Sequence, residues 1–340
     1  MALKTLRVHT YALLLLILSI SSLAAQTQQE HAEALFQEGY VLYQQRYGAV
    51  AITPLEEAAK LGHAEAAYWV GEILRKRYGF ISNEIEQFYR QAADGGEVYA
   101  MLRFAQKGKM CGTLRNCDYD RQKWIDRAKE IALPQARAGD TQAMMAVSLA
   151  YGLSGSLSKE LEWVKRAAEN QHSFAQYWLA VGMLDAQQMG FYWTKESRQE
   201  DILKWLRASA ENGYPPAMLK LAITLREQND LEQARYWVEQ MAQTDYYDAV
   251  VEAGTQIMMG PDVGEILLPS ISYHFEKPRP VQGAALLMAV HRQTGKSAPM
   301  KVIDAYREHL TPEMLKKAKT LSKELLVDTP IIYYLPKFGI

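Results

Sequence analysis

An excess of charge of either sign is missing from this chain of 340 residues. It carries 38 Lys and Arg against 39 Asp and Glu, a formal net charge of -1, and the two signs are well mixed along it. Proteins that bind nucleic acid or an anionic membrane surface carry a strong basic excess. We therefore exclude nucleic acid and a membrane surface as the expected partners.

A hydrophobic run long enough to cross a membrane is missing as well. The longest apolar run, from Tyr11 to Ile20, falls short of the roughly 20 residues that a spanning helix needs. Basic residues precede it and small ones follow, ending at Ala24 and Ala25, which is the layout of a secretory signal peptide. We expect a signal peptide over residues 1–25, and no stable membrane anchor because no cysteine stands at the cleavage site to carry a lipid. The predicted location is the bacterial periplasm.

Cysteine is nearly absent, since Cys111 and Cys117 are the two that the sequence contains. An oxidising compartment favours a disulfide between them across their short intervening loop. The alternative is a pair of metal ligands, but no His or further Cys stands nearby to complete a tetrahedral site. We expect the disulfide.

A complete catalytic constellation is also missing. Ser156 and Lys159 match the Ser-x-x-Lys pattern in which lysine helps to activate a serine nucleophile, but its companion elements Ser-Asp-Asn and Lys-Thr-Gly do not occur. No two His residues have the spacing of a zinc-binding helix. We expect no enzyme activity, no cofactor and no metal. The alternative is a β-lactamase-like or peptidoglycan-directed hydrolase that uses Ser156 and Lys159.

What the chain does contain is a repeat. A short segment, seen most clearly from Gly213 to Ala217, recurs six times. Its final alanines are Ala66, Ala100, Ala143, Ala175, Ala217 and Ala249. They are spaced by about 34, 43, 32, 42 and 32 residues, the range typical of helical hairpin repeats. The fourth copy has Gln171 in place of the leading glycine, and the sixth has no such glycine.

The residues around each copy predict a pair of antiparallel helices. Five positions after each alanine stands a small residue, which lets helices approach closely: Gly71, Ala105, Ser148, Ala180, Ala222 and Gly254. Eight positions before the glycine, five copies have a bulky residue: Phe88, Ile131, Trp163, Trp205 and Trp237. Apolar residues recur at helical spacing on both sides of the glycine, which can end one helix in a left-handed cap. No single pair could bury its apolar face alone, so the pairs must stack.

The segment from Trp205 to Ala222, with Ala-Glu-Asn-Gly-Tyr-Pro-Pro-Ala at its centre, resembles a Sel1-like repeat. This family is a short relative of the tetratricopeptide repeat, and the resemblance covers residues from about 50 to 259. It implies an all-α fold, a right-handed α/α superhelical solenoid of about six hairpins with capping helices at both ends. It also implies a function in protein binding, since the family comprises scaffolds, adaptors and inhibitors.

We expect five segments along the chain. They are the signal peptide (1–25), an N-terminal capping helix (26–50), the Sel1-like repeats (51–259), a connection bearing Pro and Gly (260–280), and a C-terminal helical cap with an extended tail (281–340). Prolines at both ends of the apolar stretch 329–338 disfavour a helix there.

Aromatic residues outside the repeat register are the candidates for partner contact, because Tyr and Trp are enriched in binding hot spots. They are Tyr192, Trp193, Tyr246, Tyr247, Tyr273, Phe275, Tyr333 and Tyr334. Bacterial members of the resembling family include immunity proteins that neutralise effectors of type VI secretion, notably phospholipases. The resemblance therefore implies a periplasmic immunity protein whose partner is a secreted lipase effector. The alternative is an envelope scaffold or adaptor for secretion or polysaccharide export.

Overall fold

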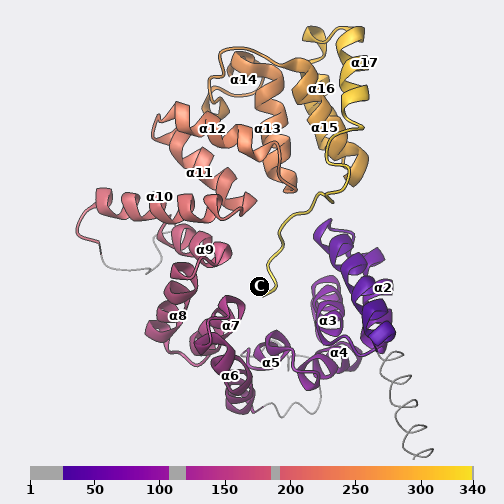
Figure 1. The fold of residues 1–340 in the computed structure, drawn as a ribbon, viewed down its shortest axis with the longest axis vertical. Coiled ribbons are helices and arrows are strands. Elements are labelled where there is room, and N and C mark those ends of the chain that lie inside the picture. Colours follow the sequence, from indigo (N-terminus) through magenta and orange to yellow (C-terminus); the bar gives the residue numbers. More distant parts are fainter. Residues whose placement is uncertain (1–25, 107–119, 185–191, 339–340) are drawn as a thin grey trace, which may run out of the picture. The chain divides into compact units, whose positions relative to one another are not determined.

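The computed structural model describes residues 26–106, 120–184 and 192–338 (Figure 1). They belong to two compact units, Met1–Ala128 (unit 1) and Lys129–Ile340 (unit 2). Both units are helical, and the extended pairing found in the described residues is an isolated bridge between Tyr246 and Ile332. The predicted signal peptide, Cys111 and Cys117 lie outside the described residues.

Unit 1 begins with a helix whose described part covers residues 26–44. The following helices are α2 (Gly48–Lys60), α3 (Ala64–Tyr78), α4 (Asn83–Asp94), α5 (Val98–Phe104) and α6 (Arg121–Arg137), which continues into unit 2. The first helix ends earlier than the expected capping segment, 26–50. Arg46 has a φ of 66°, a left-handed conformation that an α-helix does not accommodate, and residues 48–50 belong to α2.

Unit 2 contains repeat helices followed by closing helices. The array helices are α7 (Thr141–Leu153), α8 (Leu157–Glu169), α9 (Ser173–Leu184), α10 (Lys195–Glu211), α11 (Pro215–Glu227), α12 (Leu231–Met241) and α13 (Tyr247–Met259). The closing helices are α14 (Val263–Ile266), α15 (Pro280–Thr294), α16 (Ala298–Ala305) and α17 (Pro312–Leu321), with short 3-10 turns at Gly260–Asp262, Pro269–Ile271 and Arg307–His309. An extended tail follows them.

The six predicted hairpins are present, and the prediction of an all-α array of repeats is confirmed. They are α2–α3, α4–α5, α6–α7, α8–α9, α10–α11 and α12–α13, each with one copy of the repeated segment at its turn. All six alanines of the segment are buried, as are all six small residues that follow five positions later. The repeat is therefore a packing motif, because it places small side chains where neighbouring helices meet.

The position of the repeated glycine has a positive φ in the first five turns. The residues there are Gly62 (96°), Gly96 (93°), Gly139 (104°), Gln171 (65°) and Gly213 (77°). Glycine adopts this left-handed region without the steric penalty that a Cβ atom brings. The fourth turn keeps the backbone geometry although it has glutamine, so Gln171 stands in a strained conformation.

Replacing Gln171 with Gly should stabilise the protein by about 1 kcal/mol, because it removes that steric penalty. The matched change is Gly213→Gln at the same place in the next hairpin, which should destabilise by a similar amount. Thermal and denaturant unfolding of both variants beside the parent protein would measure the two effects. Opposite signs are expected, and a destabilising Gln171→Gly would show that the glutamine side chain contributes more than its backbone costs.

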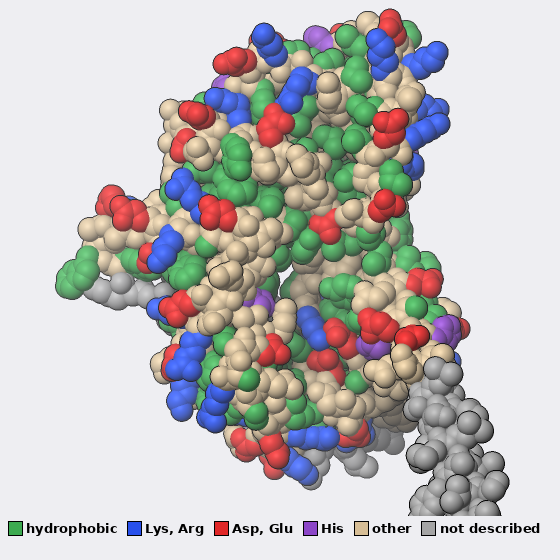
Figure 2. Space-filling view, in the orientation of Figure 1, with side chains coloured by type: hydrophobic (Ala, Val, Ile, Leu, Met, Phe, Trp, Pro, Cys, Tyr) green, Lys and Arg blue, Asp and Glu red, His purple; other side chains and the backbone are tan. Residues whose placement is uncertain are grey.

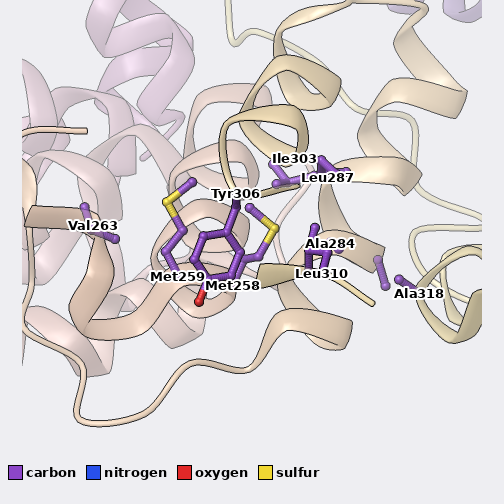
Figure 3. Packing of buried hydrophobic residues seen from close by; sticks show 10 residues of the cluster. Met258, Met259, Val263, Ala284, Leu287, Ile303, Tyr306, Leu310 and Ala318 are labelled. Carbon is purple, nitrogen blue, oxygen red and sulfur yellow. The ribbon is translucent and has the colours of Figure 1, made fainter. Parts of the chain in front are cut away.

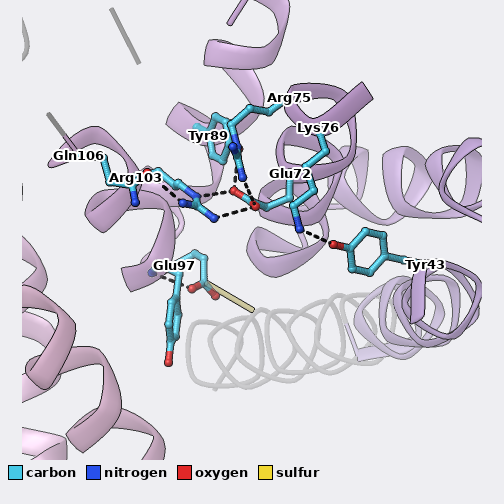
Figure 4. A network of polar contacts seen from close by, with 9 residues as sticks. Tyr43, Glu72, Arg75, Lys76, Tyr89, Glu97, Arg103 and Gln106 are labelled. Atoms are coloured by element: carbon cyan, nitrogen blue, oxygen red, sulfur yellow. Dashed lines mark hydrogen bonds and ion pairs between the residues drawn. The ribbon is translucent and has the colours of Figure 1, made fainter. Parts of the chain in front are cut away.

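An ion-pair network is buried in unit 1 (Figure 4). Glu72 on α3 and Arg103 on α5 are both fully buried, and the guanidinium donates from Nε (2.5 Å) and Nη2 (2.8 Å) to the two carboxylate oxygens. Arg75 and the Tyr89 hydroxyl also donate to this carboxylate, at 3.0 and 2.7 Å. Burial alone would raise the pKa of Glu72, but the two arginines outweigh it and hold the pKa below its usual value. The network joins α3, α4 and α5 through one charged centre.

The closing helices pack against α13 at very short range. Gly254 on α13 faces Gly283 on α15, and a Cβ at Gly283 would overlap the Gly254 carbonyl and the Met258 backbone. The close approach lets Met258, Met259 and Leu287 enter one apolar cluster (Figure 3). Its other fully or nearly buried members are Val263, Ala284, Ala285, Ile303, Tyr306, Leu310 and Ala318. This cluster covers the end of the array, as a terminal cap must.

Charged side chains of both signs are interspersed over the described parts of the face shown in Figure 2. Lysines gather over α17, where Lys316, Lys317 and Lys319 are exposed. The mixed surface agrees with the balanced composition of the sequence.

Candidate binding surface

The extended tail folds back onto the array within unit 2 (Figure 1). Ile332 pairs through its backbone with the turn between α12 and α13: its N–H donates to the Asp245 carbonyl (2.8 Å), and its carbonyl accepts from the Tyr247 N–H (2.9 Å). The sixth turn lacks the repeated glycine, and the tail satisfies backbone groups there. Just before this bridge, the Ile331 N–H donates to the side chain of Gln293 on α15 (2.8 Å).

A row of aromatic side chains follows the turns of the last three hairpins, and we call it the turn-side row. Its members are Phe174, Tyr177, Tyr214, Tyr246 and Tyr334, each partly exposed. Tyr214 is the centre, with ring centroids 6.2 Å from Phe174, 5.4 Å from Tyr177 and 5.5 Å from Tyr334. Tyr334 in turn lies 5.7 Å from Tyr246, with nearly perpendicular planes. Such edge-to-face contacts stabilise aromatic pairs and fix their orientation.

Four of the eight predicted contact residues meet at this place. Tyr246 and Tyr334 belong to the row, while Tyr247, which is 8% exposed, stacks on Tyr333 at 4.7 Å. Two tyrosine hydroxyls of the row donate hydrogen bonds to carboxylates: Tyr334 to Asp245 (2.6 Å) and Tyr246 to Asp248 (2.9 Å). The sequence indicated these tyrosines as candidates because they lie outside the repeat register. It did not predict that they meet, because 89 positions separate Asp245 from Tyr334. Their meeting depends on the path of the tail.

Two other predicted contact residues are internal. Tyr273 is fully buried with the Arg226 guanidinium 4.8 Å from its ring centre, and Phe275 is 9% exposed. The segment that carries them is held by Arg235, which donates to the Tyr273 carbonyl, and by Gln256, which accepts from its N–H. The rings of Tyr273 and Phe275 pack inside unit 2, so they are not presented to a partner in this structure.

The remaining two predicted residues precede α10. Tyr192 is partly buried, and its hydroxyl donates to Asp201 (2.9 Å). Trp193 is 89% exposed, the highest value among the exposed large hydrophobic residues of the described chain. An indole presented in this way stays a candidate anchor for a partner, separate from the turn-side row.

Open grooves lie in both units of the described chain. A groove of about 620 Å³ in unit 1 is lined by turn residues of the first two hairpins, including His63, Glu65 and Glu97. A groove of about 660 Å³ in unit 2 lies between α10 and the ends of α9 and α11, with Glu196 and Glu227 among its lining residues. The second groove shares no residue with the turn-side row. Both are open to solvent, so they suit a protein surface better than an enclosed small molecule.

The histidines at the turns act as helix caps. Nδ1 of His63 accepts from the Ala66 N–H (3.1 Å), and Nδ1 of His172 accepts from the Ala175 N–H (3.0 Å). His172 is 8% exposed, so it is a buried cap and not a solvated turn residue. Burial lowers its pKa and favours the neutral ring that this cap requires.

The hydrolase alternative rests on Ser156 and Lys159. Ser156 is the residue before α8, and the Lys159 ammonium lies over the ring of Tyr151, 5.2 Å from its centre. Among the described residues, no three His, Cys, Asp or Glu side chains come together as metal ligands. No helix in the described ranges has the length and apolar character of a membrane span.

The six hairpins with a common turn motif decide the type of fold. The described residues form an all-α array of helical hairpin repeats. This array resembles a crystal structure described as a protective antigen of uropathogenic Escherichia coli strains with an SLR fold, at 17% identity and a TM-score of 0.46. That match covers 89% of this chain and 62% of the antigen. A Sel1 repeat protein from Oxalobacter formigenes matches 62% of this chain and 85% of its own, at 24% identity and a TM-score of 0.35.

In sequence, the chain is similar to an F-box protein of Arabidopsis thaliana, with 33% identity over 101 residues. That stretch covers 30% of this chain and 26% of the F-box protein, so the two share about a quarter of the plant protein's length. No family model matches the chain.

Proposed function

We propose that this protein binds another protein through the turn-side row of unit 2. The observation that carries the proposal is the row itself, five partly exposed aromatic rings in mutual contact along three successive turns. Rigid aromatic side chains lose little conformational entropy on binding and dominate interface hot spots. Stacked hairpins also present an extended surface, which repeat proteins use for protein partners.

We propose further that the partner is a toxic effector and that the protein is its immunity protein. The support is the resemblance to bacterial Sel1-like members that neutralise type VI secretion phospholipases, together with the expected signal peptide and periplasmic location. Such an inhibitor holds one enzyme in a tight one-to-one complex and stops its activity. An envelope scaffold is the second candidate, and the separate groove beside α10 favours it, because a scaffold needs a second face.

The test begins with capture of partners from periplasmic extract and from the type VI secretome, followed by titration of purified candidates. One-to-one binding of a lipase with loss of its activity is expected. Binding of envelope-assembly proteins without inhibition of an enzyme would contradict the immunity role and leave the scaffold.

Tyr177→Ala should then weaken binding of the identified partner by at least about 30-fold, the effect of losing a hot-spot residue of about 2 kcal/mol. The matched control is Tyr236→Ala, which removes a tyrosine that is 53% exposed on α12 and not part of the row. Isothermal titration would give both dissociation constants, and circular dichroism would verify the fold. Equal affinities for the two variants would rule out the row as the binding surface.

A further inference from the structure

The C-terminal tail lies on the turn-side row as an extended peptide would. Ile331 is fully buried, and the next residue, Ile332, supplies both backbone hydrogen bonds to the sixth turn. Tyr333 and Tyr334 then place their rings against Tyr247 on one side and against Tyr246 and Tyr214 on the other. The seat, defined as Tyr214, Asp245, Tyr246 and Tyr247, is thus filled by three consecutive residues, 332–334.

The chemistry of the seat is general enough to accept another chain. Its backbone bonds, from the Tyr247 N–H and to the Asp245 carbonyl, recognise any extended segment, as in strand addition. The Tyr334 hydroxyl on the Asp245 carboxylate and the stacked rings select aromatic side chains at two consecutive positions. The seat therefore recognises the backbone of one residue and the Tyr-Tyr pair that follows it.

The tail is held there under local strain. Tyr334 has a φ of 51° and Leu326 one of 55°, both in the left-handed region that non-glycine residues avoid. Strained residues persist where surrounding contacts hold them, and they concentrate at functional sites. At Tyr334 those contacts are the rings of Tyr214 and Tyr246 and the Asp245 carboxylate. A segment that fills the same contacts without this strain would gain the free energy that the strain costs the tail.

We propose that the seat is the recognition site for an extended, Tyr-rich segment of the partner protein, and that residues 332–334 occupy it until that segment replaces them. This inference rests on the proposed function, since it states which part of the partner the row receives. The tail is then an internal competitor, and release of it exposes Tyr214, Tyr246 and Tyr247 together.

The probe for the test is a fluorescently labelled peptide with the sequence of residues 328–338, added to the full-length chain. Two chains are compared by fluorescence anisotropy: the parent, and Tyr333→Ala/Tyr334→Ala, which removes the tail rings and loosens the tail. The double variant should bind the peptide at least about 10-fold more tightly than the parent, because its seat is vacated. A control peptide with both tyrosines changed to alanine should bind neither chain.

A third chain carries Tyr246→Ala in addition to Tyr333→Ala/Tyr334→Ala. Its affinity for the peptide should fall back below that of the double variant, because Tyr246→Ala removes one ring of the seat. Hydrogen exchange at the start of α13 should rise in the double variant while α9 and α11 keep their protection, which shows that the fold is intact. Absence of peptide binding by such an opened chain would overturn the proposal, as would equal affinity of the parent and double variant. A parent chain that is dimeric by light scattering, and monomeric after loss of the two tyrosines, would assign the seat to a second copy instead.

The two proposals fail in distinguishable ways. If the opened chain binds the peptide but no protein partner depends on Tyr177, the seat is supported as a peptide site and the proposed function is contradicted. A partner that depends on Tyr177, with no peptide bound by the opened chain, would keep the proposed function and overturn the tail as competitor.

Discussion

Glu72→Gln should lower the free energy of unfolding of unit 1 by about 3–5 kcal/mol, because it leaves the buried Arg103 guanidinium without its counter-ion. Both charged groups are fully buried, and the carboxylate accepts hydrogen bonds from two arginines and from Tyr89. An amide cannot accept from all of them, and it cannot neutralise either cation. The loss should appear as faster amide exchange in α3 and α5, with the helices of unit 2 unaffected.

The matched control is Glu86→Gln on α4, which removes a surface partner of Arg90, whose side chain is 48% exposed. Surface pairs of this kind contribute roughly 0–1 kcal/mol. Replacing Glu72 and Arg103 together with Met should recover much of the loss, since an apolar pair needs no compensation of charge. If Glu72→Gln costs no more than Glu86→Gln, the network does not hold unit 1 together.

The pH dependence of the same group has a defined sign. The pKa of Glu72 lies below its usual value of 4.5 in the folded protein, so the unfolded chain binds the proton more readily. Its contribution to stability is complete above about pH 4.5 and is lost as the pH falls through the folded pKa. The Glu72→Gln variant should lack this part of the acid sensitivity.

Gly283→Ala should destabilise unit 2 by about 3 kcal/mol or more, the upper range for overpacking, because the new methyl group would meet backbone atoms that cannot rotate away. The atoms are the Gly254 carbonyl oxygen and the Met258 nitrogen, with the Met258 Cβ at 2.5 Å. Separating α13 from α15 would open the cluster around Leu287 that closes the array. Calorimetry should show a lower melting temperature for this variant.

Gly264→Ala is the control for this change. A Cβ there would lie 3.6 Å from the Pro269 Cα and 3.9 Å from the Ser272 Cβ, which is ordinary contact distance. Alanine is also a better helix former than glycine, so this variant should be neutral or more stable by up to about 1 kcal/mol. Equal melting temperatures for the two variants would mean that α13 and α15 can separate at little cost.

Much of the helical plan could be predicted from the sequence, because each hairpin carries its own local signals. Glycine at the turn, a small residue after it and helical periodicity reappear in every well-formed copy, so the six pairs follow from short segments. Even the Gln171 copy keeps the turn, since packing of its buried Ala175 compensates a local penalty. These signals act over one or two helical turns and need no knowledge of distant residues.

The network and the seat could not be predicted, because both join residues far apart in sequence. Glu72 lies among nine consecutive buried residues of α3. A carboxylate within so apolar a segment is the one local signal that could have indicated a buried cationic partner. Nothing in the local pattern connects Asp245 with Tyr334, or places Tyr273 beneath Arg226. Contacts of this kind depend on where the chain returns after the closing helices.

The position of Gln293 has a consequence for how the tail can leave. Its amide nitrogen donates to the Leu326 and Thr329 carbonyls, and its oxygen accepts from the Ile331 N–H, directly before the Ile332 bridge. Ile331, which Gln293 holds, and Ile332, which forms the bridge, are adjacent in sequence. The tail therefore cannot shift its register while both contacts are kept. A shift by one position would also exchange the sides of Tyr333 and Tyr334. The tail should therefore detach and rebind as one all-or-none step, and never slide along the seat.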